Sequence, residues 1–102
     1  MIGFTDEEKH RMAMHGAEHF ADTFAKTLTG EERKALIAEI YPLELEDIEA
    51  SERILPRPGI FDTRADDEYL KVSNRIMIRE LEILPKYGIH PNIERLKKMI
   101  TL

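Results

Sequence analysis

The chain has 102 residues, of which 42% are hydrophobic and 34% are charged, a composition too apolar for a disordered chain and typical of one globular domain. It contains no cysteine, which excludes disulfides, thiolate metal sites and a cysteine nucleophile, and which favours a reducing cytoplasm over secretion. The net charge of −5 argues against nucleic acid as the main partner, and no apolar run approaches the roughly 20 residues that span a membrane.

The first predicted helix begins after Thr5. Thr5 and Glu8 form a capping-box pattern, in which the hydroxyl accepts from a free backbone amide and the carboxylate reaches back to the cap. An apolar stripe at helical spacing follows, made of Ala13, Ala17, Phe20, Phe24 and Leu28. Thr29-Gly30 is expected to end this helix.

Thr29 and Glu32 repeat the capping-box pattern, so a second helix is expected to begin at once. Tyr41-Pro42 is expected to interrupt it, because proline lacks an amide hydrogen and disfavours a helical residue before it. A third helix then runs from about Pro42 to about Leu55, with Leu45, Ile48 and Leu55 inward and acidic side chains around them. These acidic residues are Glu44, Glu46, Asp47, Glu49 and Glu52.

The segment Pro56-Arg57-Pro58-Gly59 breaks the helical pattern, and Asp62 or Thr63 caps a fourth helix that runs to about Leu84. This helix is predicted to be the longest. Its two adjoining apolar stripes indicate a central position with packing on both sides. They comprise Tyr69, Val72, Ile76 and Ile83, and then Leu70, Met77, Leu81 and Leu84.

Pro85-Lys86-Tyr87-Gly88 is a stop signal, and a short last helix follows His90-Pro91. No segment has the alternating pattern of a strand. The sequence therefore predicts an all-α fold: a single domain over residues 1–102, built as a compact bundle of four or five helices with short connections.

One short motif points to chemistry. His15-Gly16-Ala17-Glu18-His19 resembles the H-x-x-E-H pattern of the inverted zincins. His15 and His19 project from one helical face and could hold one zinc or iron ion, with Glu18 beside them as a base and Asp22 one turn further along. The resemblance covers five residues, and those peptidases are much larger proteins.

The same polar residues lie opposite Phe20 and Phe24, so a solvated helical face explains them without any metal. No other catalytic signature is present. The five glycines are scattered rather than gathered in a phosphate-binding loop, and neither Ser51 nor Ser73 lies in a nucleophile elbow. We therefore predict a protein that is not an enzyme, and keep metal binding or metal-dependent hydrolysis as the alternative.

Charge is unevenly distributed along the chain. The range 31–53 has eight acidic and three basic residues, a balance of −5, and the range 71–102 has three acidic and seven basic, a balance of +4. The two regions are expected to face each other within the fold, or alternatively to meet between copies. The acidic helix could also imitate the phosphates of a nucleic acid and block a basic groove, which is a further alternative.

Four apolar residues are candidates for an intermolecular contact: Met12, Met14, Ile60 and Phe61. The methionines lie off the centre of their stripe, and methionine adapts readily to different partners. We predict a small cytoplasmic adaptor, regulator or assembly factor of bacterial or phage type that binds a protein partner through helical faces. A homodimer is expected, formed by the exposed side of the fourth helix together with the Pro56–Phe61 loop.

Overall fold

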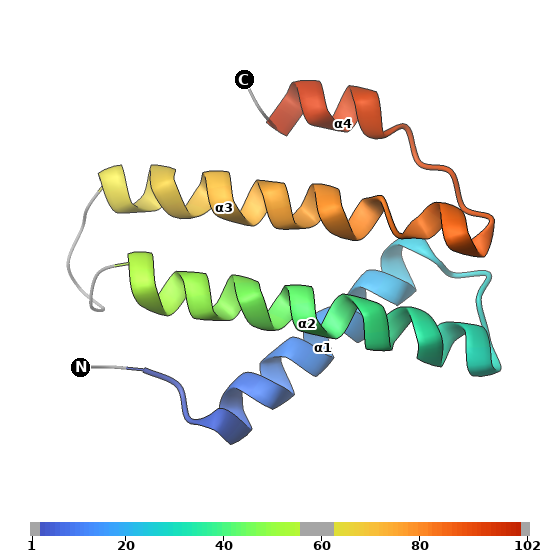
Figure 1. Ribbon diagram of the computed structural model, residues 1–102, viewed down its shortest axis with the longest axis horizontal. Coiled ribbons are helices and arrows are strands. Elements are labelled where there is room, and N and C mark those ends of the chain that lie inside the picture. The colour runs from blue at the N-terminus through green and yellow to red at the C-terminus, as the bar shows by residue number, and fades with distance from the viewer. Residues whose placement is uncertain (1–2, 56–62, 101–102) are drawn as a thin grey trace.

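The computed structural model describes residues 3–55 and 63–100 of the chain. These residues form four α-helices and one short 3-10 helix, with no strand among them, which confirms the predicted all-α class (Figure 1). The elements are α1 (Asp6–Phe24), α2 (Gly30–Ile54), α3 (Thr63–Leu81), η1 (Leu84–Tyr87) and α4 (Ile93–Ile100). No helix in the described part of the chain is long and apolar enough to cross a membrane.

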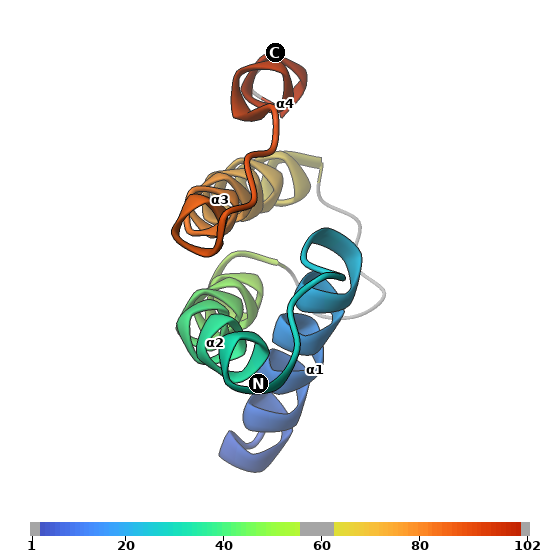
Figure 2. The same ribbon diagram turned by 90° about the vertical axis from the view of Figure 1, so that its right-hand side faces the viewer.

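The helices pack in chain order, so that α2 lies between α1 and α3, and α3 lies between α2 and α4. α1 lies across one side of α2, α3 lies along another, and α4 lies beyond α3 (Figures 1 and 2). The C-terminal end of α1 approaches α3, whereas its N-terminal half diverges from it. The result is flat, with extents of 42 × 35 × 15 Å. The expectation that the helix starting near Thr63 is the longest is wrong, since it has 19 residues and α2 has 25.

The predicted interruption at Tyr41-Pro42 is also wrong, because α2 continues through Pro42 without a break. Proline deprives only one carbonyl, that of Ala38, of its helical partner. Ala38 and Pro42 are both exposed, so water can reach that carbonyl. Leu36 and Ile40 before the proline and Leu43 after it are all buried, and their packing keeps the helix continuous.

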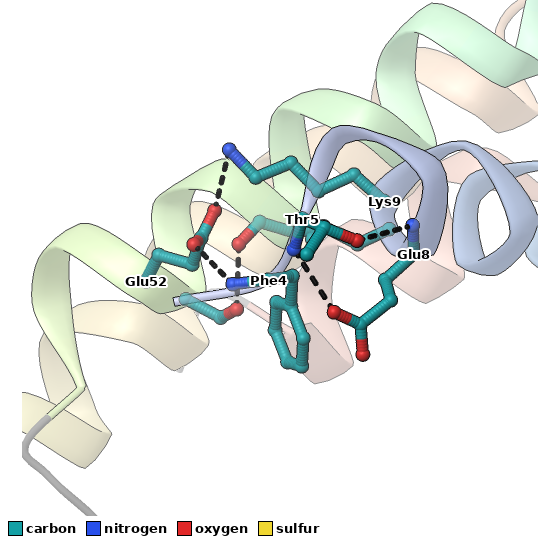
Figure 3. Close-up of polar contacts among 7 residues, drawn as sticks. Phe4, Thr5, Glu8, Lys9 and Glu52 are labelled. Atoms are coloured by element: carbon teal, nitrogen blue, oxygen red, sulfur yellow. Dashed lines mark hydrogen bonds and ion pairs between the residues drawn. The ribbon is translucent and has the colours of Figure 1, made fainter. Parts of the chain in front are cut away.

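The two capping boxes have different outcomes. At the start of α1, the Glu8 amide donates to Thr5 Oγ1 over 3.1 Å and the Thr5 amide donates to Glu8 Oε1 over 3.0 Å, which confirms the first box (Figure 3). Thr29 is the N-cap of α2, but its side chain makes no capping bond. Gly30 has a φ of +57°, and this left-handed residue sets the entry to α2 in place of a capping box.

The first helix ends at Phe24 and not at Thr29-Gly30, because Ala25 leaves the helical conformation and the chain turns back. The turn brings Ala25 and Leu28 into the same core cluster. This cluster joins α1, the turn after it, α2, the C-terminal end of α3 and η1. It consists of Ala17, Phe20, Ala21, Ala25, Leu28, Leu36, Ile40, Leu81 and Leu84.

The acidic and basic regions of the chain face each other, as the charge distribution predicted. Glu46 of α2 pairs with Arg79 of α3 at 2.9 Å. Glu39 accepts from Lys86 at 2.6 Å and from the Tyr87 hydroxyl, and these two bonds, in that order, lower the pKa of its carboxyl. The bond to Glu39, followed by burial, raises the pKa of Tyr87 to about 12.

A further set of contacts ties the start of the chain to the end of α2. Glu52 accepts from the Phe4 amide and from Lys9 Nζ, each over 2.9 Å (Figure 3). The two oxygens of one carboxylate therefore anchor both the segment before α1 and its first turn. This anchor holds the N-terminal half of α1 against α2 while it diverges from α3.

Candidate functional site

The residues of the H-x-x-E-H pattern lie on the surface of α1. His15, Glu18, His19 and Asp22 are all exposed. Asp22 is not placed as a third ligand, because it accepts from Arg33 of α2 over 2.7 Å. Within residues 3–55 and 63–100, no group of three or more His, Asp or Glu side chains is arranged to hold a metal ion. Metal binding therefore remains a prediction, with no third ligand among these residues.

The two histidines also border different hollows. His15 lines a shallow depression together with Glu8, Arg11 and Met12. His19 lines a separate pocket on the side of α1 that faces α3. The two histidines of the H-x-x-E-H pattern are therefore surface residues that line different hollows.

The predicted contact residues are only partly within the described structure. The Met12 side chain is 41% exposed, and Met14 is half-buried. Ile60 and Phe61 lie outside the described residues, as does the expected break at Pro56–Asp62. Met12 precedes His19 by seven residues, so the two share one flank of α1.

The candidate site is the pocket beside His19, which has a volume of about 350 Å³ and lies between α1, α2 and α3. Its size falls in the range of small-ligand sites. We call it the acidic pocket, because three carboxyl side chains line it. Its lining residues are Gly16, His19, Phe20, Thr23 and Phe24 of α1, Glu44 and Asp47 of α2, and Ser73, Met77 and Glu80 of α3.

The two α2 carboxyl groups of the pocket contact different neighbours, since Asp47 bonds to side chains of α3 and Glu44 packs against α1. Asp47 accepts from the Tyr69 hydroxyl over 2.8 Å and from the Ser73 hydroxyl over 3.5 Å. Glu44 packs against the backbone of α1 at Gly16, where a Cβ atom would lie only 2.6 Å from Glu44 Oε1. Glycine at this position therefore leaves room for a carboxyl group between the two helices.

Glu80 is the unusual member of the pocket. Its side chain is only 4% exposed, and Oε2 has no hydrogen-bond partner. Burial, reinforced by the charges of Glu44 and Asp47, raises the pKa of Glu80 to about 8. Glu80 is therefore largely protonated at neutral pH when the pocket is empty.

The neighbouring groups respond to the same environment. Burial, and then the charge of Asp47, raises the pKa of Glu44. Burial, and then the hydrogen bond to Asp47, raises the pKa of Tyr69 to about 12. The pKa values of Glu44, Tyr69 and Glu80 are all raised, which disfavours additional negative charge, so the pocket is suited to a positive one.

The walls and rim of the pocket are apolar. Phe20 is buried, and its ring centroid lies 4.9 Å from that of Phe24. Phe24 and Met77 are 37% and 41% exposed on opposite walls. Leu70, at 56%, lies two turns before Met77 on the same flank of α3. Exposed apolar side chains thus surround an acidic interior.

The sequence contains a signal for this pocket, because two of its carboxyl residues lie within apolar stripes. On α2 the buried residues Leu36, Ile40, Leu43 and Ala50 recur at helical spacing, and Asp47 occupies the same stripe. On α3, Glu80 lies between Ile76 and Ile83 in a predicted apolar stripe. A carboxyl group within an apolar stripe requires a partner or a raised pKa, whereas one on the wet side does not.

Comparison of the chain with protein-family models, with curated proteins and with solved structures found no match.

Proposed function

We propose that this protein acts by binding another protein through the face that surrounds the acidic pocket. This α1–α3 face consists of the acidic pocket together with Met12 of α1 and Leu70 of α3. The observation that carries the proposal is the exposure of Phe24 and Met77 on opposite walls of one open pocket, with Leu70 exposed further along α3. Single exposed apolar residues are common, but a group of them around a hollow is typical of an interaction site.

The packing of the helices explains why this face lacks cover. α1 approaches α3 only near its C-terminal end (Figures 1 and 2), and Leu70 and Met77 of α3 remain exposed. A partner helix or a second copy laid beside α3 would bury these side chains. Burial of apolar surface contributes about 25 cal/mol per Å², which favours such a contact.

A second copy of the chain is the first partner to test. The exposed side of the helix that begins near Thr63 was predicted from sequence as a dimer contact, and Leu70 and Met77 lie on that side. A two-fold dimer would use the same patch twice. In this proposal the protein serves as a cytoplasmic adaptor, regulator or assembly factor, and the lack of cysteine supports the cytoplasmic assignment.

The alternative of a nucleic-acid mimic has less support. Glu39, Glu46 and Glu52 of α2 are engaged by Lys86, Arg79 and Lys9 within the chain. Glu44 and Asp47 face the acidic pocket. A mimic needs a row of exposed acidic groups, and these five carboxylates already serve internal contacts or the pocket.

The proposal is tested with the double variant Leu70→Glu, Met77→Glu. Light scattering over a range of concentrations measures self-association, and affinity capture from the native cell, followed by mass spectrometry, measures binding to other proteins. The double variant should lose the dimer or the captured partner, because two charges would have to be buried at the contact. Both substitutions are at exposed positions, so the helical circular dichroism spectrum should be unchanged.

Lys71→Glu is the matched control. It lies on α3 between the two test positions, faces away from the pocket by the helical period, and changes the net charge by the same −2. Retention of the dimer or partner in this control and its loss in the double variant would support the α1–α3 face. A monomeric wild type that captures the same proteins as the double variant would overturn the proposed function.

A further inference from the structure

We propose that the acidic pocket is a binding site for a primary ammonium group carried on an alkyl chain. The proposal deepens the function above by giving the chemistry of the group that the α1–α3 face recognises. If a partner protein supplies the ammonium as a lysine side chain, the inference rests on that function; if a free amine supplies it, the site stands by itself.

The first support is the Oε2 atom of Glu80, which is buried and has no hydrogen-bond partner. A buried oxygen without a hydrogen bond costs free energy, and natural structures contain few of them. The lining residues include no lysine or arginine that could approach Glu80. The nearby cations Arg79 and Lys86 are paired with other carboxylates. His19 is the one basic side chain among the lining residues, and the pocket has no lysine or arginine to pair with its three carboxyl groups.

The second support is the number and arrangement of the polar groups. Glu44 and Asp47 come from α2 and Glu80 comes from α3, so carboxyl groups from two helices line the pocket. A primary ammonium group has three donors and no acceptor, so it pairs with carboxyl oxygens. Glu80 would supply the oxygen that now has no partner.

The third support is the apolar wall. Phe20, Phe24 and Met77 line the same pocket as the carboxyl groups. An alkyl chain would lie against these side chains while its ammonium head reaches the interior, as lysine stems commonly do. A bare metal ion would gain nothing from such walls, and the described residues offer no group of ligands arranged to coordinate one.

Binding of a cation should be coupled to loss of the Glu80 proton. The titratable groups that line the pocket are His19 from α1, Glu44 and Asp47 from α2, and Glu80 from α3, and the Tyr69 hydroxyl donates to Asp47. Of these, Glu80 is the carboxyl group whose pKa is raised to about 8. An arriving ammonium favours the carboxylate, so affinity should rise with pH by about tenfold or more between about pH 6.5 and about pH 8.5.

The test is a two-dimensional amide NMR titration of the full chain with three probes. Hexylammonium carries the charge on an alkyl chain, hexanol is its neutral match, and Nα-acetyl-lysine methylamide presents the charge as a partner protein would. Saturable shifts are expected for amides around Gly16, Glu44 and Met77 with hexylammonium and not with hexanol. Binding of the lysine probe as well would identify a protein side chain as the source, and binding of hexylammonium alone would identify a free amine.

Glu80→Gln should weaken hexylammonium binding by about tenfold or more and should remove its pH dependence, because the charged partner is lost. Glu82→Gln, an exposed position two residues away, is the control and should bind as the wild type does. Circular dichroism of both variants verifies the fold. Equal binding of hexylammonium and hexanol, or undiminished binding to a folded Glu80→Gln variant, would overturn the proposal.

These outcomes are separate from those of the proposed function. If the chain captures a partner through Leu70 and Met77 but binds no ammonium probe, the inference fails and the interaction module stands. If the ammonium probe binds but the Leu70→Glu, Met77→Glu variant changes no association, the proposed function fails and the acidic pocket remains a site for a free amine.

Discussion

Replacing Glu80 by glutamine should stabilise the folded protein at about pH 8 and leave its stability nearly unchanged at about pH 5. The wild-type carboxyl group is 4% exposed and has a pKa of about 8 in the folded state, compared with 4.5 for an unperturbed glutamate. The folded state thus holds a proton that the unfolded state releases above about pH 4.5. Wild-type stability should therefore fall as pH rises from about 4.5 to about 8.

The size of the effect follows from the two pKa values. The difference between 4.5 and about 8 corresponds to about 5 kcal/mol of unfolding free energy, which is a ceiling. Relaxation of the pocket and entry of water reduce it, so we expect about 2–3 kcal/mol. That is a large fraction of the 5–15 kcal/mol that typically stabilises a domain. Glutamine is neutral throughout and nearly isosteric, so the variant avoids this loss.

Urea unfolding followed by circular dichroism at about pH 5, 6.5 and 8 measures the difference. Three other carboxylates, those of Glu8, Glu39 and Glu52, have lowered pKa values, so their stabilising contributions are lost as pH falls below about 4.5. These contributions are the same in the wild type and in Glu80→Gln, so they cancel when the two stabilities are compared. Glu82→Gln should follow the wild type. Parallel stability profiles of wild type and Glu80→Gln would refute a raised pKa at this site.

Three further substitutions test the fold, each measured by urea or thermal unfolding at neutral pH. Pro42→Ala should stabilise the protein by about 1–3 kcal/mol, since it restores the amide that bonds the Ala38 carbonyl, and a destabilised variant would mean that proline shapes α2 in another way. Thr5→Ala should cost about 1 kcal/mol through loss of the cap, and no change would contradict the capping box. Tyr87→Phe should cost about 1 kcal/mol because its bond to Glu39 is lost, whereas an unchanged midpoint would show that bond to be unimportant.

Local signals in the sequence predicted the class of the fold. The capping box at Thr5, the helical spacing of Ala13, Ala17 and Phe20, and the absence of alternating strands all concern neighbours in the chain. Ion pairing between the acidic and basic regions followed from counting charges. These features depend little on how the helices meet, and that is why they could be predicted from sequence.

The pocket depends on how the helices meet, and it was missed for a physical reason. Placing a helix end at Pro42 removed the continuity that puts Asp47 in phase with the buried Leu36, Ile40 and Leu43. A helix that begins at Pro42 instead places Asp47 among the acidic side chains around the inward-facing residues. The buried position of Glu80 in turn requires the crossing of α1 over α2 to close the pocket. Tertiary packing overrode the proline signal, and the spacing within one helix shows that a carboxyl group falls in an apolar stripe but not which other helix covers it.

The chain-order packing of α1, α2, α3 and α4 has a kinetic consequence. Each helix finds its principal neighbour one short connection away, so the chain closes mainly small loops as it folds. Such a topology resembles a short linear array, in which order can spread outward from the pair formed by α1 and α2. Among the described helices, α4 packs mainly against α3 and has the sparsest contact, so its amides should exchange with solvent far ahead of those in α2.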